Sequence, residues 1–211
     1  MGFRLWLAAL VATATAGATQ AADLTIQLRD AAGRPVADAV VTLYPKAGTP
    51  PPSQTGVAWP MRMEQKNRMF SPFVLIVPVG ATVAFPNFDS VRHHVYSFSP
   101  AHPFELKLYG HDETRSVRFD KPGPVALGCD IHDQMIAFIR VVDTPLAAKS
   151  DANGLARFSG APVGDATMRI WHPYLKAPAN EVALPVAVKP AGERRTVTID
   201  VRAPPPIGAD Y

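Results

Sequence analysis

The sequence predicts an all-β protein, and two observations carry that prediction. The 22 prolines and 14 glycines are spread between short runs rich in valine, isoleucine, threonine and phenylalanine, which is typical of short strands joined by turns. No long stretch shows the apolar periodicity of an amphipathic helix. With 211 residues, the chain is long enough for one large domain or two small ones.

Residues 1–22 have the pattern of a secretory signal peptide. Arg4 is the only charge, an apolar core follows it, and small residues at the end offer a cleavage site. The alternative is an uncleaved anchor, but the apolar run is short and interrupted for a membrane span. We therefore expect a periplasmic or secreted protein with no membrane span after cleavage. Losing Arg4 lowers the formal net charge from +3 to +2, and without a Lys/Arg cluster we expect no nucleic-acid partner.

Two strands are expected at the start of the mature chain, over residues 24–28 and 39–44. Asp30 and Gly33 supply turn geometry between them, and Pro35 marks the return because it cannot donate to a central ladder. Residues 46–56 contain three consecutive prolines and no periodicity, which indicates a linker or an extended crossover.

Further strands are expected over residues 73–77, 82–85 and 95–98. His93 and His94 begin the last of these, and neighbours on a strand face opposite sides, so only one of the pair can face a given site. Phe104, Leu106 and Leu108 alternate with polar residues and are expected to share one face of a half-buried strand.

The strongest chemical signal is the loop Cys129-x-x-His132-x-x-Met135, between two apolar runs. Cys129 is the only cysteine, so in an exported chain it is a free thiol, an intermolecular bridge or a metal ligand. The spacing favours the last, because a thiolate, an imidazole and a thioether in one loop suit copper cycling between Cu(I) and Cu(II). Such a site needs a second histidine from elsewhere in the chain.

The segment FPNFDSVRHHVYSFSP, followed by FELKLYG and LGCDIHDQM, resembles the cupredoxins, the plastocyanin-like blue copper proteins. More narrowly, it is similar to the plastocyanin-like proteins of methylamine utilisation. The resemblance implies a Greek-key sandwich, one type-1-like copper ion, and a one-electron carrier rather than an enzyme, docking transiently on redox partner proteins. It implies that the copper ligands are His93, Cys129, His132 and Met135.

Three further residues are candidates to support the ligands from behind: Asn87, Asp89 and His94. We take His93 as the upstream ligand from its register with the Asn-x-Asp motif. Many plastocyanin-type sequences have Pro before this ligand and Asn after it, where this chain has Arg92 and His94. The His-x-x-Met spacing is also short for the family, which could alter axial bonding and the reduction potential.

The remaining histidines are interpreted as loop residues rather than ligands. They are His102, His111 and His172. For His172, which follows Trp171 in a turn, the alternative is an approach to the copper loop or to a partner. A second, harder metal site formed by His111 with Asp112 and Glu113 is the alternative for that loop.

The C-terminal part resembles the second half of a carboxypeptidase regulatory-like β-sandwich. Turns at 151–154 and 162–165 flank an apolar strand, a strand ends at Trp171, and another is expected over 196–201. Residues 23–45 match the module's usual opening. We therefore predict a discontinuous outer domain, 23–56 plus 146–203, with the cupredoxin domain 57–145 inserted and a flexible tail 204–211. Two tandem domains are the alternative.

Three functions are consistent with the sequence. The first is a periplasmic electron carrier. The second is a copper-binding or copper-storage module without a redox partner, whose outer domain binds a protein or a glycan. The third is a hydrolase using Cys129 and a histidine, which is disfavoured because no helix is predicted to carry the nucleophile.

Overall fold

The computed structural model describes residues 20–48 and 60–204. Most of the predicted signal peptide, most of the predicted linker, and the tail beyond Pro204 lie outside these residues. The described chain is all-β, as predicted, with a single 3-10 turn, η2 (Pro178–Asn180). None of its helices is long and apolar enough to cross a membrane.

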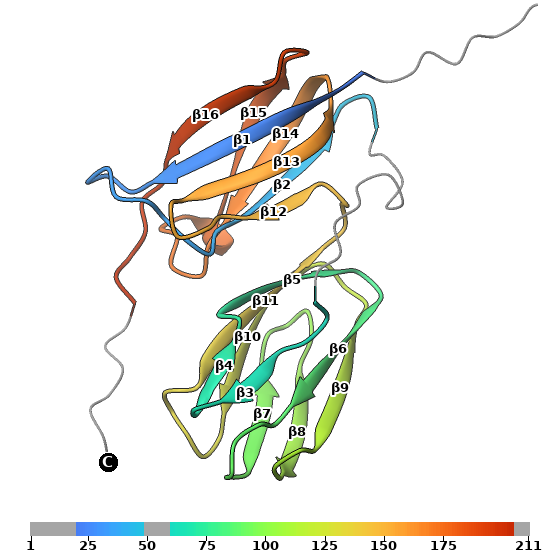
Figure 1. Cartoon of the computed structure of the whole chain (residues 1–211), viewed down its shortest axis with the longest axis vertical. Coiled ribbons are helices and arrows are strands. Elements are labelled where there is room, and N and C mark those ends of the chain that lie inside the picture. Colours follow the sequence, from blue (N-terminus) through green and yellow to red (C-terminus); the bar gives the residue numbers. More distant parts are fainter. Residues whose placement is uncertain (1–19, 49–59, 205–211) are drawn as a thin grey trace, which may run out of the picture.

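The strands form two groups of sheets, stacked one above the other in Figure 1. The central unit, residues 60–142, contains β3 (Glu64–Lys66), β4 (Met69–Ser71), β5 (Val74–Pro78), β6 (Ala81–Pro86), β7 (His93–Ser97), β8 (Phe104–Tyr109), β9 (Thr114–Phe119), β10 (Gly123–Cys129) and β11 (Ile136–Val142). The outer unit, residues 20–48 and 143–204, contains β1 (Ala21–Arg29), β2 (Val40–Pro45), β12 (Ala147–Lys149), β13 (Leu155–Pro162), β14 (Gly164–Trp171), β15 (Glu181–Val188) and β16 (Glu193–Thr198).

The central unit has the layout of a sandwich with Greek-key connections. Its main sheet has the order β5-β11-β10-β7-β8, with β11 parallel to β5 and the other neighbours antiparallel. The chain leaves this sheet after β5 and after β8, and the two excursions, β6 and β9, pair with each other. This topology brings the start of β7 and the end of β10 side by side, because Cys129 pairs with Val95.

The outer unit joins the two flanks of the chain. β1 lies between β13 and β16, and β2 lies between β12 and β14, so each N-terminal strand is held by C-terminal ones. β1 begins at Ala21, so the last two residues of the predicted signal segment are paired with Pro162 and Ala161.

Burial follows the same grouping. One buried apolar cluster is drawn entirely from the outer unit, and a second from the central unit. A third, smaller cluster joins the units through Val40, Val74, Ile76, Val142, Ala147 and Trp171. Arg140 of β11 also pairs with Glu181 of β15, and its guanidinium lies 5.6 Å from the Trp171 ring. The two units therefore pack on each other through apolar and charged contacts, while the inserted-domain division itself stays a prediction.

The sequence missed two features of the fold. The β3–β4 hairpin and strand β15 were not expected, because neither sequence shows the regular alternation of apolar and polar residues that predicts a half-buried strand. The expectation that Leu108 shares a face with Phe104 and Leu106 was wrong, because the β7–β8 pairing shifts register and Tyr109 takes the buried position instead. Leu108 is left 47% exposed.

Candidate metal centre

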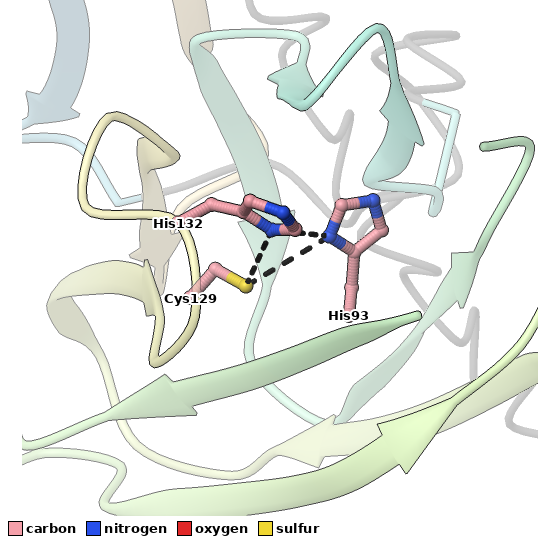
Figure 2. A group of neighbouring side chains, drawn as sticks. All are labelled: His93, Cys129 and His132. Carbon is pink, nitrogen blue, oxygen red and sulfur yellow. Dashed lines mark hydrogen bonds between the residues drawn. The ribbon is translucent and has the colours of Figure 1, made fainter. Parts of the chain in front are cut away.

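Three donor atoms predicted from the sequence converge at one end of the central unit. His93 Nδ1 lies 3.2 Å from His132 Nδ1, and Cys129 Sγ lies 3.8 Å from His93 Nδ1 and 3.6 Å from His132 Nδ1. Figure 2 shows the two imidazoles and the thiol pointing into the same space, with His93 approaching from a strand separate from the loop. Within the described ranges, this is the only group of three or more His, Cys, Asp or Glu side chains close enough to hold a metal ion.

The loop between β10 and β11 is folded by its own backbone. His132 N donates to Cys129 O and Met135 N donates to His132 O, so the chain turns at every third residue. The first of these turns accompanies the close approach of Cys129 Sγ to His132 Nδ1, at 3.6 Å. Met135 is buried in the core of the central unit and is the residue immediately before β11.

Strand alternation decides which of the adjacent histidines faces the cluster. Along β7 the residues alternate between buried and half-buried, with His93 among the buried ones. His94 points to the other face, where its Nε2 lies 2.8 Å from Glu105 Oε1. The geometry therefore brings His93, and not His94, to Cys129 and His132.

Asn87 and Asp89 brace the turn that leads to His93. Buried Asn87 donates through Nδ2 to Val91 O and accepts a bond from the Asp89 amide. The Asp89 carboxylate lies 2.8 Å from His93 Nε2. Burial opposes ionisation of Asp89, but hydrogen bonds from the Arg68 amide, the His93 ring and the Asn67 amide together lower the pKa of its carboxyl.

The environment of His132 favours a neutral ring. Burial, then the neighbouring His93 and Arg68, lower the pKa of this imidazole, and Asp89 opposes them only in part. A neutral imidazole has a free lone pair, which is the form that binds a metal ion. His132 is also the most accessible of the three donors, since His93 and Cys129 are buried.

The spacing of the donors fits a first-row metal ion. An ion about 2.0 Å from each nitrogen and about 2.3 Å from sulfur, in a trigonal plane, would separate sulfur from nitrogen by about 3.7 Å and the nitrogens by about 3.5 Å. The observed separations of 3.8, 3.6 and 3.2 Å are close to these values. A His₂Cys donor set is typical of blue copper centres, so these three donors fit copper. Met135 as a fourth ligand stays a prediction.

Among residues 20–48 and 60–204, the other histidines form no comparable cluster. His111 Nδ1 lies 3.1 Å from the Asp89 carbonyl oxygen and its Nε2 lies 3.1 Å from Asp112, but the loop does not gather three donors around one point. His102 accepts a hydrogen bond from the Lys121 amide. His172 belongs to the outer unit, is buried, and lines a cleft that the outer unit shares with the central unit.

A cleft that sequence reasoning did not foresee lies between the two units. Its volume is about 790 Å³, and its central-unit wall includes Phe73, Asp133 of the loop between β10 and β11, and Ile136 at the start of β11. Its outer-unit wall includes His172 and Tyr174. Only the docking of the two units creates this cleft, so no local sequence pattern marks it.

Comparisons with solved structures find copper proteins similar to part of this chain. No family model matches the chain, and no curated protein matches it. The copper-containing nitrite reductase of Thermus scotoductus SA-01 is 30% identical over 44% of this chain and 26% of its own length, with a TM-score of 0.39. The purple cupredoxin of Nitrosopumilus maritimus is 22% identical over 38% of this chain and 98% of its own length, with a TM-score of 0.35. A reduced Cu(I) form of an amicyanin variant is 17% identical over 48% of this chain and 98% of its own length, with a TM-score of 0.37.

These similarities cover about half of this chain or less, and only about a quarter of the nitrite reductase. The proteins are of the kind that the sequence motifs resemble. TM-scores this low carry no argument about function, so the functional proposal is built on the geometry of the site.

Proposed function

We propose that this protein is exported, binds one copper ion through His93, Cys129, His132 and Met135, and carries single electrons between partner proteins. The observation that carries the proposal is the convergence of three donor atoms at the separations that a trigonal copper ion requires. Bound copper would supply a one-electron couple between Cu(I) and Cu(II).

The burial of the donors favours electron transfer over substrate turnover. His93, Cys129 and Met135 are each at most 3% exposed, so little of the site is open to a substrate. The half-buried His132 is the donor nearest to solvent, and its ring edge is the proposed exit for the electron. The same reasoning makes the protein a carrier rather than an enzyme.

The surface around His132 suits transient docking. Ile131 and Ile136, on either side of it in sequence, are 48% and 41% exposed. Exposed apolar side chains around a functional group are a common mark of a protein interaction site. The proposed partners are redox proteins that cover this apolar surface briefly.

A second candidate function is favoured by the cleft between the units. The protein would then be a copper-binding or storage module, and the outer unit would bind a protein or a glycan. The cleft is lined partly by Asp133 of the loop between β10 and β11 and by Ile136 at the start of β11, so an occupant would touch that loop directly.

Redox cycling of the copper-loaded protein distinguishes these functions. We expect one equivalent of Cu(II) to produce an intense red-region absorption, which ascorbate bleaches and hexacyanoferrate(III) restores over repeated cycles. Bound copper without colour or reversible cycling would favour the storage or interaction module. A protein indifferent to copper but with a reactive Cys129 thiol would favour the hydrolase.

Export has a separate test. We expect a mature N-terminus near the start of β1 when the full chain is produced with an intact secretion pathway, measured by mass spectrometry of the extracellular or periplasmic fraction. Recovery of the uncleaved chain in the cytoplasm alone would contradict export.

A further inference from the structure

The two nitrogens of the His93 ring have different partners. Nε2 lies 2.8 Å from Asp89 Oδ2, while Nδ1 lies beside Cys129 Sγ and His132 Nδ1. The His93 side chain is fully buried and that of Asp89 is 12% exposed, so water competes little for this contact. A carboxylate only accepts, so the contact places a hydrogen on Nε2, and in the neutral ring that binds a metal ion the Nδ1 lone pair faces the other two donors.

Asp89 is itself held by the tip of the β3–β4 hairpin. Its carboxylate oxygens accept hydrogen bonds from Asn67 N at 2.6 Å and Arg68 N at 2.9 Å. Asn67 and Arg68 both have left-handed backbone, with φ of 57° and 54°, which is uncommon for residues other than glycine. With three N–H groups around it, the carboxylate has little freedom to leave His93.

A hydrogen bond from a ligand imidazole to a carboxylate makes the imidazole a stronger donor. A stronger, more negative donor stabilises Cu(II) more than Cu(I), because the attraction grows with the charge of the ion. Because Cu(II) is stabilised more than Cu(I), the reduction potential of the one-electron couple falls. Low exposure strengthens the effect, since a buried hydrogen bond is electrostatically stronger than one in water.

We propose that Asp89, clamped by the β3–β4 hairpin, lowers the reduction potential of the copper site through His93. The proposal rests on the proposed function and adds to it a positioning residue and the hairpin that holds it. Asp89 touches neither the copper ion nor a redox partner in this account. It acts only through the far nitrogen of His93.

The chain offers a matched control for the test. His94 Nε2 lies 2.8 Å from Glu105, the same separation as in the His93–Asp89 pair, but His94 faces away from the donors. Asp89→Asn and Glu105→Gln therefore each remove one carboxylate charge from a histidine near the site, and only the first acts on a proposed ligand.

We expect Asp89→Asn to raise the reduction potential and Glu105→Gln to leave it nearly unchanged. Loss of such a partner changes metal affinity by about 10-fold to 100-fold. If that loss falls mainly on Cu(II), a tenfold change in the affinity ratio corresponds to about 59 mV. Cu(II) and Cu(I) affinities are to be measured separately by competition, so that the ratio is obtained even where the variant binds more weakly.

A copper-free measurement separates this inference from the proposed function. In the apo wild type, ¹⁵N chemical shifts of the His93 ring should show a protonated Nε2 and an unprotonated Nδ1. An apo ring protonated on Nδ1 alone, or an Asp89→Asn protein with the wild-type affinity ratio, would overturn the inference and leave copper binding intact. A wild type with the expected tautomer that takes up no copper would overturn the proposed function, and the tuning role with it.

Discussion

Acid should destabilise this protein through one buried histidine outside the metal site. His172 is 8% exposed, and burial lowers its pKa from 6.5 to about 4, with nearby Asp38 opposing the shift. Its Nδ1 accepts a hydrogen bond from the Tyr174 amide, which also requires an unprotonated nitrogen. The folded protein therefore binds the His172 proton less readily than the unfolded chain does.

The sign and size of the effect follow from these two pKa values. Above pH 6.5 both states hold a neutral His172, and the full stability is present. As the pH falls, the unfolded chain takes up the proton first, which lowers the free energy of unfolding by about 2 kcal/mol at pH 5 and about 3 kcal/mol at pH 4. Below pH 4 the folded state takes up the proton too, and the loss from this residue levels off at about 3.4 kcal/mol.

Urea unfolding of the wild type and of His172→Gln between pH 7 and pH 4 measures this contribution. The glutamine variant should be less stable at pH 7, because it replaces a packed ring, but its stability should fall less steeply with acid. The difference between the two pH profiles isolates His172 from the other titrating groups. Parallel profiles from pH 7 to pH 4 would mean that His172 has the same pKa in the folded and unfolded states, contrary to this prediction.

Two further predictions concern the fold and the choice of ligand. Gly154→Ala should lower the free energy of unfolding, measured in urea, by more than about 1 kcal/mol. Its φ is +75°, and the new Cβ would lie 2.3 Å from the Leu28 carbonyl oxygen. Gly160→Ala, at φ +70° but with open space around it, should cost only the backbone strain of about 1 kcal/mol; equal losses would contradict the steric argument. His93→Gln should abolish the red-region absorption with Cu(II) and His94→Gln should keep it, and the reverse result would exchange their roles.

Local patterns were enough to predict most of what the site needs. The period-two alternation of a strand starting at His93 is why only one of the two adjacent histidines could face a given site. The unpaired Cys129 and its spacing to His132 indicated donors in one loop, and the turns at every third residue agree with that. The all-β class followed from the proline and glycine distribution.

What the sequence could not supply depends on contacts between distant segments. The turn at Asn67 and Arg68 carries no glycine, and the left-handed backbone of Arg68 has no signal in the sequence, although asparagine adopts this conformation more readily than most residues. Its contact with Asp89 joins residues 22 positions apart and is visible only after folding. The exposed Leu108 likewise results from a register shift between β7 and β8 that alternation alone does not predict.

The central claim is that Cys129 binds copper as a thiolate, together with two imidazoles. The most direct test is a Cu(II) titration of the purified full chain, followed by absorption, for the wild type and for Cys129→Ser. In the wild type, an intense red-region absorption band should grow until one equivalent of Cu(II) has been added. In Cys129→Ser the band should be absent. A wild type that shows no such band, or a serine variant that keeps it, would contradict the claim.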